Sequence, residues 1–135
     1  MFINQNKHTN HYFFMRLALA QAQKNLGNTK ENPSVGCIIT KNNLVLSAGS
    51  TSITGRPHAE HNAISLSRRN LKNSELYVTL EPCSHYGKTP PCIKKIIKHG
   101  IKKVFFSIND PDLRSFDRSA KLLKKKGISV HKGIY

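Results

Sequence analysis

Between residues 76 and 108 the sequence places one helical pattern between two patterns typical of buried strands. The stretches LYVTL at 76–80 and KVFFSI at 103–108 are rich in β-branched and aromatic side chains, which favour strands. Between them, Pro91 precedes three isoleucines at helical spacing, and Gly100 follows as a helix-ending residue. Strands that alternate with helices imply a central sheet covered by helices on both faces.

Patterns elsewhere in the chain extend this sheet. Strand and helix periodicities, together with turn residues, predict the following further elements: a helix over 10–26 ended by Gly27, strands VGCIIT (35–40) and LVLSAG (44–49) joined by the turn KNN, a helix with Pro57 in its first turn, a helix over 113–126, and a possible last strand ISVHKG (128–133). We therefore expect an α/β fold with three layers, in which a central mixed sheet of about five strands contains one antiparallel hairpin.

The length of the chain fits one domain. It has 135 residues, enough for one compact core and too few for two ordinary ones. The polar residues 1–10 are expected to be a flexible segment and residues 11–135 the domain. The start has no signal-peptide or membrane-spanning pattern, and three cysteines without a secretion signal indicate reduced thiols and a cytoplasmic setting.

The chain is strongly basic, with 22 Lys and Arg against 7 Asp and Glu and a formal charge of +15. Such a balance suggests a nucleic-acid partner, because cations that contact phosphates release counterions. However, 16 of the cations are Lys and only 6 are Arg, and Arg is the better match to phosphate forks and base edges. We therefore interpret the charge as a compositional bias spread over the surface, and not as a nucleic-acid site.

Three residues that can bind soft metals fall at the ends of predicted elements. His58 lies near the start of the second helix, Cys83 follows the strand at 76–80, and Cys92 starts the helix after Pro91. Helix N-termini favour thiolate over thiol, because unpaired amides stabilise negative charge. One histidine and two thiolates form a three-ligand shell for Zn²⁺ that leaves a fourth position for water, as catalytic zinc sites do.

Glu60 lies two residues after His58 and suggests a use for such a water. Zinc acidifies its bound water into a nucleophile near neutral pH. A carboxylate beside it is suited to take the proton and pass it to a ring nitrogen and then to a leaving amine. Zinc deaminases of nucleobases carry H-x-E followed by P-C-x-x-C, and this chain has HAE at 58–60 and PC at 82–83.

The spacing of the two cysteines is longer than in that pattern. Cys92 follows Cys83 by nine residues, a length that could extend over about 30 Å. Two thiolates on one tetrahedral zinc ion lie only about 4 Å apart. The loop SHYGKTPP between them must therefore bulge outward and return to the metal.

Neighbouring residues of similar chemistry have simpler interpretations. Cys37 alternates with apolar residues on one strand face and is expected in the core. His61 follows His58 by one helical turn and is expected at the surface, although a structural zinc site closed by His61 is an alternative. Glu81 precedes Pro82 in a turn and is expected to hold the loop in place, not to catalyse.

The stretches NPSVGCIIT, GRPHAE and YVTLEPCSHYGKTPPCIKKIIKHGIKKVFFSINDPD resemble the deaminase domain of the riboflavin-biosynthesis enzymes that act on diaminohydroxyphosphoribosylaminopyrimidine. The resemblance runs from about residue 12 to the end. Its most specific part is the long spacing between the two cysteines together with the residues SHYGKTPP that lie between them. It implies the cytidine deaminase-like fold, one zinc ion, and hydrolytic release of ammonia from 2,5-diamino-6-ribosylamino-4(3H)-pyrimidinone 5′-phosphate.

The resemblance also implies roles for individual residues. His58, Cys83 and Cys92 match the zinc ligands and Glu60 matches the proton relay. The substrate contacts implied by the match are Asn32, His85, Lys88, Thr89 and Asp110. A cation such as Lys88 in the loop suits a phosphate-bearing substrate.

The chain departs from the family pattern at three places. Thr51 stands where the family usually has His, Asp112 where it usually has Asn, and residues 115–119 where a glycine-containing segment is usual. A deaminase of another nucleobase or nucleotide is therefore the nearest alternative, and a basic nucleic-acid-binding module with structural zinc is the more distant one. The family often fuses this domain to a reductase. We expect none here, with a separate reductase for the next step and a homo-oligomeric assembly.

Overall fold

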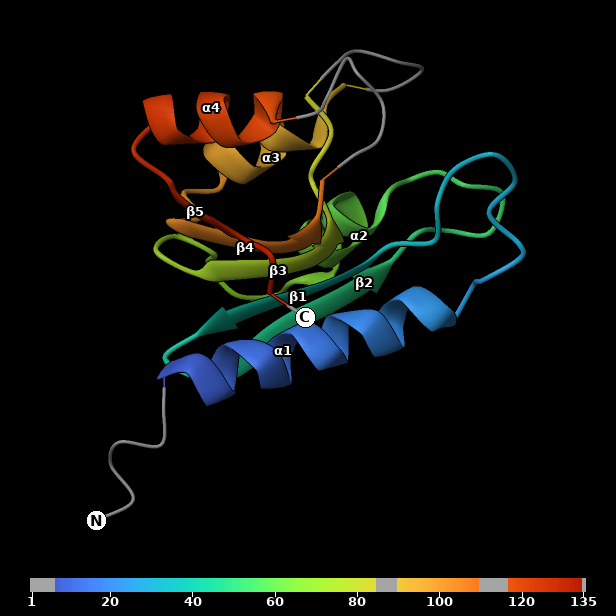
Figure 1. Ribbon diagram of the computed structural model, residues 1–135, viewed down its shortest axis with the longest axis horizontal. Coiled ribbons are helices and arrows are strands. Elements are labelled where there is room, and N and C mark those ends of the chain that lie inside the picture. Colours follow the sequence, from blue (N-terminus) through green and yellow to red (C-terminus); the bar gives the residue numbers. More distant parts are fainter. Residues whose placement is uncertain (1–6, 85–89, 110–116, 135) are drawn as a thin grey trace.

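The protein folds into one mixed five-stranded sheet with helices on both faces (Figure 1). The computed structural model describes residues 7–84, 90–109 and 117–134. The elements in chain order are α1 (Lys7–Gln23), β1 (Gly36–Lys41), β2 (Leu44–Ser50), α2 (Ala59–Leu66), β3 (Glu75–Leu80), α3 (Cys92–Lys98), β4 (Lys103–Ile108), α4 (Arg118–Lys125) and β5 (Ser129–Lys132).

The order of strands in the sheet is β2-β1-β3-β4-β5. Strand β1 pairs antiparallel with both β2 and β3, whereas β3, β4 and β5 are parallel. This arrangement confirms the expected mixed sheet with one antiparallel hairpin. The parallel strands end at the same edge, so the segments that follow β3 and β4 lie close together, and Glu81 N–H donates to the Ile108 carbonyl oxygen at 2.9 Å.

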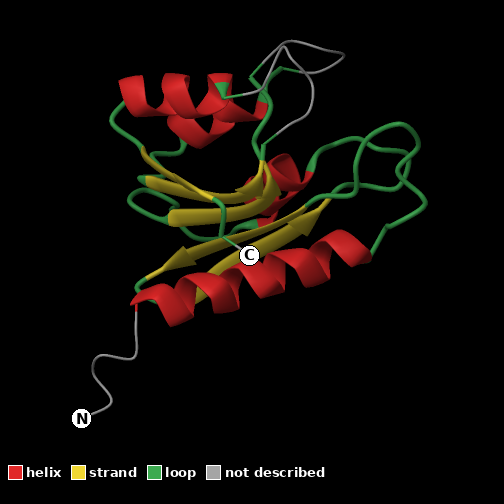
Figure 2. Ribbon diagram, in the orientation of Figure 1, coloured by secondary structure: helices red, strands yellow, loops and turns green. Residues whose placement is uncertain are grey.

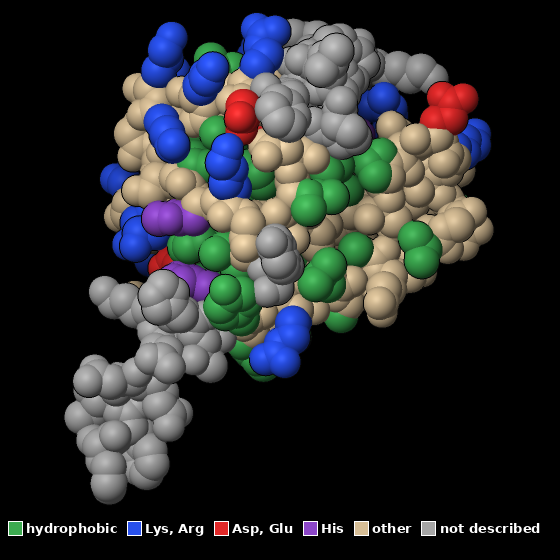
Figure 3. All heavy atoms as spheres, viewed as in Figure 1, with side chains coloured by type: hydrophobic (Ala, Val, Ile, Leu, Met, Phe, Trp, Pro, Cys, Tyr) green, Lys and Arg blue, Asp and Glu red, His purple; other side chains and the backbone are tan. Residues whose placement is uncertain are grey.

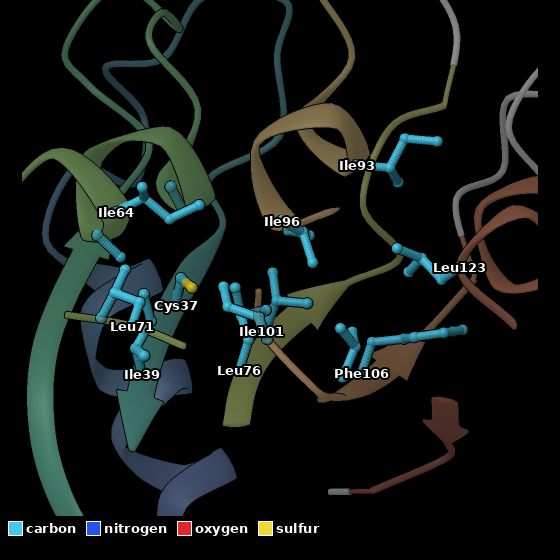
Figure 4. Packing of buried hydrophobic residues seen from close by; sticks show 14 of the residues in the cluster. Cys37, Ile39, Ile64, Leu71, Leu76, Ile93, Ile96, Ile101, Phe106 and Leu123 are labelled. Atoms are coloured by element: carbon cyan, nitrogen blue, oxygen red, sulfur yellow. The ribbon is translucent and has the colours of Figure 1, made fainter. Parts of the chain in front are cut away.

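Alternating side chains along the strands build two separate apolar layers. On one face, Ile38, Tyr77 and Phe105 pack against α1. On the other face, the larger cluster joins the strands to α2, α3 and α4; Figure 4 shows Ile96 and Leu123 of these helices gathered over strand residues such as Leu76 and Phe106. The three expected layers are therefore present, with red helices above and below the yellow strands in Figure 2.

Helix α1 differs from the prediction in its bounds and in its buried face. It spans Lys7–Gln23 instead of 10–26, so it begins inside the segment expected to be flexible. The helical spacing of Tyr12, Met15, Leu19, Ala22 and Leu26 predicts one buried stripe. In the structure Met15 is buried, but Tyr12 and Leu19 are exposed and Leu26 lies beyond the helix. The cause is that residues 12–22 are apolar around almost the whole helix, so their spacing does not define a single face.

Two other helices begin later than predicted. Pro57 precedes α2 and does not lie in its first turn, because His58 is the residue that caps the helix. Helix α4 begins at Arg118, after Asp117 in the left-handed conformation (φ 57°). The predicted start of that helix, at 113–116, falls outside the described residues. All five strands agree with the prediction to within one residue at either end.

On one face of the molecule, positive charge is spread in the way that the composition suggested (Figure 3). On the face in Figure 3, Lys and Arg side chains occur in several separate areas and outnumber the acidic ones. The described residues include no helix that is both long enough and apolar enough to cross a membrane.

Gly49 lets α2 approach the sheet closely. A Cβ atom at this position would lie 2.5 Å from both the carbonyl oxygen of Ala59 and the backbone nitrogen of Ala63. Both atoms belong to the backbone of α2, so only a shift of the helix could relieve the clash. Because α2 follows His58 directly and carries Glu60, this contact also determines where those two side chains lie.

We predict that Gly49→Ala lowers the free energy of unfolding by about 1–3 kcal/mol, as overpacking of a core commonly does. Chemical denaturation of the purified protein would measure the change. Ser50→Ala on the same strand, which adds no atoms, is the matched control and should unfold close to wild type. Equal stability of Gly49→Ala and wild type would contradict the close approach of α2.

Candidate metal centre

Three side chains from distant parts of the sequence meet at one edge of the sheet. His58 caps the start of α2, Cys83 follows β3, and Cys92 is the first residue of α3. The nitrogen and sulfur atoms of this group all lie within 4.8 Å of one another. The loop between the cysteines therefore returns to its starting point, as the cysteine spacing required.

The distances within the group fit a tetrahedral zinc ion. Nδ1 of His58 lies 3.8 Å from Sγ of Cys83 and 3.5 Å from Sγ of Cys92. With Zn–S distances of about 2.3 Å and a Zn–N distance of about 2.1 Å, tetrahedral ligand atoms lie roughly 3.5–3.8 Å apart. One imidazole nitrogen and two sulfurs are also a donor set that zinc prefers. The residues present thus suit this metal in both geometry and chemistry.

The pKa values of the two thiols are shifted in opposite directions. Hydrogen bonds lower the pKa of Cys83 to about 4, first from the Cys92 side chain and then from His58 and the Cys92 backbone amide. That amide lies 3.1 Å from Sγ of Cys83. The pKa of Cys92 is raised well above its usual range, because its proton is held in the bond to Cys83 and burial disfavours a second thiolate.

His58 has a raised pKa, chiefly through its hydrogen bond to Cys83. The group therefore contains one thiolate, that of Cys83, which is available to bind a metal. A divalent cation could displace the protons of the other two ligands, Cys92 and His58.

Glu60 lies in the first turn of α2 and is buried next to this group. Its side chain is 4% exposed. Burial, followed by the negative charge of Cys83, raises the pKa of Glu60 to about 7. Glu60 is not a member of the group of three ligand atoms. A buried carboxyl with this pKa can either hold or accept a proton near neutral pH, as a general acid and base must.

His61 points toward α3 instead of joining the three residues. Its Nε2 lies 3.5 Å from Nζ of Lys95, and burial together with the charges of Lys95 and His58 lowers its pKa. Within the described part of the chain, His61 does not belong to the metal-binding group. The alternative of a structural site closed by His61 therefore gains no support from the geometry.

The loop before His58 is held by residues that the sequence did not single out for this purpose. Asn62 in α2 donates to the carbonyl oxygen of Ser50 and to the hydroxyl of Ser52, both at 2.8 Å. Thr51 is 1% exposed, and its hydroxyl accepts from the amide of Val35 at 2.8 Å. No spacing pattern marks these residues, because folding alone brings their partners, mostly backbone groups, near to them.

The substrate contacts implied by the resemblance lie mostly outside the described residues. This holds for His85, Lys88, Thr89 and Asp110. Asn32 is described, and its Nδ2 donates to the carbonyl oxygen of Gly55 at 3.0 Å. This bond ties the loop that follows α1 to the loop that leads to His58.

Two other expectations from the sequence are confirmed. Cys37 is fully buried in the sheet core, where burial raises its pKa. Glu81 is buried and accepts hydrogen bonds from residues beyond β4, among them Asn109, Asp117 and Ser119. Its carboxylate therefore holds neighbouring segments in place, as its position before Pro82 suggested.

Comparisons with known proteins agree with the geometry of the group. A family model described as the cytidine and deoxycytidylate deaminase zinc-binding region matches residues 8–108. A diaminohydroxyphosphoribosylamino-pyrimidine deaminase of Buchnera aphidicola subsp. Acyrthosiphon pisum is 40% identical over 125 residues, which cover 93% of this chain and 85% of that protein. A riboflavin biosynthesis protein RibD of Actinobacillus pleuropneumoniae is 43% identical over 121 residues, which cover 90% of this chain and 32% of that protein.

Solved structures show the same likeness. The deaminase/5-amino-6-(5-phosphoribosylamino)uracil reductase of Thermotoga maritima matches with a TM-score of 0.89 and 37% identity, over 96% of this chain and 38% of that one. A form of Acinetobacter baumannii RibD matches with a TM-score of 0.91 and 36% identity, over 96% of this chain and 36% of that one. The chain thus spans about a third of the length of these RibD proteins.

We predict that the purified protein carries about one zinc ion per chain and that Cys83→Ala or Cys92→Ala loses most of it, because two remaining ligands bind zinc weakly. Metal analysis of the desalted protein would measure the ratio. Cys37→Ala removes the third cysteine from the core and is the matched control, which should keep its zinc. Full zinc occupancy in both ligand variants would contradict the assignment of this group.

Proposed function

Because the chain belongs to the cytidine and deoxycytidylate deaminase family, we propose that it is a zinc-dependent hydrolase that releases ammonia from an aminopyrimidine. The single observation that carries the proposal is the meeting of His58, Cys83 and Cys92 at zinc-ligand distances beside the buried carboxyl of Glu60. A structural zinc site has no need of a buried acid with a pKa near neutrality, whereas hydrolysis of the bond between a ring carbon and its exocyclic amine needs a group that both accepts and donates protons.

The proposed substrate is 2,5-diamino-6-ribosylamino-4(3H)-pyrimidinone 5′-phosphate. Support comes from the Buchnera aphidicola deaminase, most of whose length this chain covers, and from the long loop between Cys83 and Cys92. In this proposal Asn32, His85, Lys88, Thr89 and Asp110 contact the substrate. A lysine in that loop would offer a charge-assisted hydrogen bond to the phosphate.

The chain's own residues account for the proton movements of the reaction. His58, Cys83 and Cys92 would hold the zinc ion, and bound zinc supplies a Lewis acid that lowers the pKa of water. A carboxylate oxygen of Glu60 takes a proton from the attacking water and delivers it to the adjacent ring nitrogen. The same carboxyl then passes the second water proton to the exocyclic amine, so that the C–N bond breaks, ammonia leaves and a carbonyl remains.

The environment of Glu60 suits both halves of this cycle. Burial raises its pKa to about 7, which brings the protonated and ionised forms close in free energy near neutral pH. Its position in the first turn of α2, two residues after His58, keeps the carboxyl beside the metal ligands. The close approach at Gly49 and the hydrogen bonds of Asn62 hold that turn in place.

A reductase that acts on the deaminated product is the protein partner that this proposal implies. The Thermotoga maritima relative combines the deaminase with a 5-amino-6-(5-phosphoribosylamino)uracil reductase. The homo-oligomer expected from the sequence stays a prediction.

We predict that the zinc-loaded protein releases ammonia from the ribosylaminopyrimidine phosphate and that its gene restores growth of a riboflavin auxotroph that lacks this deaminase. An ammonia assay with matched amounts of cytidine, deoxycytidylate and guanine derivatives tests the substrate directly. Release from one of those compounds alone would leave the metal chemistry intact and overturn the choice of substrate. Steeply salt-dependent RNA binding without any ammonia release would favour the nucleic-acid-binding module.

We predict that Glu60→Gln keeps its zinc but loses activity by about 10²–10⁴-fold, the usual contribution of general acid–base catalysis. Ammonia release and metal content should be measured on the same preparation. Glu75→Gln, a change of the same type on β3, is the control and should retain activity. Wild-type turnover by Glu60→Gln would exclude Glu60 as the proton relay.

A further inference from the structure

The side chain of Asn62 joins the two ends of the loop between β2 and α2. Its Nδ2 donates at 2.8 Å to the carbonyl oxygen of Ser50, the last residue of β2, and at 2.8 Å to the hydroxyl of Ser52. The same nitrogen lies 3.3 Å from the carbonyl oxygen of Pro57, at the far end of the loop. Both ends of this loop are therefore held by one amide group of α2.

The chemistry of these partners determines which way the Asn62 amide points. The backbone oxygens of Ser50 and Pro57 can only accept hydrogen bonds, so the nitrogen of the amide, and not its oxygen, must face them. Its two hydrogens face three oxygens, and the longest contact, to Pro57, therefore shares a hydrogen with one of the shorter two. The loop thus uses the whole donor capacity of this side chain.

The backbone of His58 is bonded to Asn62 on both sides. The carbonyl before it, that of Pro57, accepts from the Asn62 side chain and also from the Ser52 amide at 3.1 Å. The carbonyl of His58 accepts from the Asn62 backbone amide at 3.1 Å. The backbone of His58 is extended (φ −71°, ψ 165°), and its side chain makes no capping bond to α2. The start of this helix is therefore secured by Asn62 and not by its capping residue.

The position of the imidazole follows from this backbone. Nδ1 of His58 lies 3.8 Å from Sγ of Cys83 and 3.5 Å from Sγ of Cys92. Nδ1 is attached to Cγ, so only two side-chain rotations separate it from the main chain. The two sulfurs belong to the end of β3 and to α3. A shift of the loop before α2 would therefore move the imidazole away from the sulfurs and leave them in place.

We propose that Asn62 is a positioning residue for the metal: it holds the backbone on both sides of His58, so that the imidazole already stands at its ligand position when zinc binds. Asn62 contributes no ligand atom and acts only through the loop. Residues that orient metal ligands commonly change metal affinity by about 10- to 100-fold. The inference goes beyond the proposed function, because it concerns zinc affinity and applies whichever compound is deaminated.

Three substitutions separate the hydrogen bonds from the shape of the side chain. Asn62→Asp keeps the shape but has no donor, whereas Asn62→Ala removes the whole group. Ser52→Ala removes one acceptor and keeps the contacts to the two carbonyls. Asn70→Ala is the matched control: Asn70 also bonds to a backbone group, the Lys72 amide at 2.9 Å, but lies beyond the other end of α2.

The first measurement is the zinc dissociation constant of the full chain, by competition with a chelator of known affinity. We expect it to rise about 10- to 100-fold in Asn62→Ala, and at least as far in Asn62→Asp, whose carboxylate would repel the carbonyl oxygens. Ser52→Ala should give a smaller rise, and Asn70→Ala should stay within about twofold of wild type. Visible spectra of the Co²⁺-loaded proteins report the coordination geometry. Only the two Asn62 variants should depart clearly from the wild-type spectrum.

The second measurement distinguishes positioning from a general loss of stability. Zinc stabilises the folded protein to an extent that depends on its affinity. Positioning therefore predicts that Asn62→Ala loses more stability in the presence of zinc than in its absence. Chemical denaturation with added zinc, and again with excess chelator, measures the two losses. If Asn62→Ala does not fold without metal, the same comparison is made with Ser52→Ala.

Unchanged zinc affinity in both Asn62 variants would overturn the proposal. Equal losses of stability with and without zinc would also overturn it, because they would show a structural role alone. A larger effect of Ser52→Ala than of Asn62→Ala would assign the role to the serine hydroxyl instead. Wild-type protein that binds no zinc would remove the metal centre and this inference with it.

The proposed function can fail separately. Zinc-loaded wild type that releases ammonia from no tested compound would contradict the proposed function. The zinc affinities of the Asn62 variants would still decide the present inference, because none of its measurements depends on catalysis.

Discussion

The structure depends on holding two sulfurs and one imidazole nitrogen together at the edge of a sheet. Close thiols resist a second ionisation, and this is visible in the low pKa of Cys83 beside the raised pKa of Cys92. A divalent cation relieves that conflict, because it replaces protons and stabilises both thiolates. The three ligands come from three different elements, so the sheet and two helices must all be placed correctly before the donor set exists.

Several backbone contacts provide that placement. Gly49 allows α2 to lie close to β2, and Asn62 fixes the loop that leads to His58. Glu81 ties the end of β3 to the segments beyond β4. These residues contribute no ligand or proton, yet they determine the distances on which ligand binding and proton transfer depend. The chemistry of the site in this protein therefore depends directly on how the fold packs.

Much of the fold and the metal group could be predicted from local patterns. Turn residues and β-branched runs located the strands, since these signals act over a few residues. The face of α1 could not be predicted in the same way, because residues 12–22 are apolar on nearly every side and only the sheet decides which of them it covers. Contacts at the start of α4 were equally outside the reach of local patterns, because the Asp117 amide and the Ser119 hydroxyl donate to Glu81, a residue far away in the sequence.

By itself the sequence determined the chemical composition of the site. It contains one H-x-E pair and two cysteines after strand and loop signals, and these residue types favour a zinc centre with acid–base chemistry. Only the tertiary structure decided that the sulfurs and the imidazole lie at zinc-ligand distances, that Glu60 is buried beside them and that His61 turns toward Lys95. Distances and burial depend on packing between segments far apart in the chain, and local sequence patterns do not contain that information.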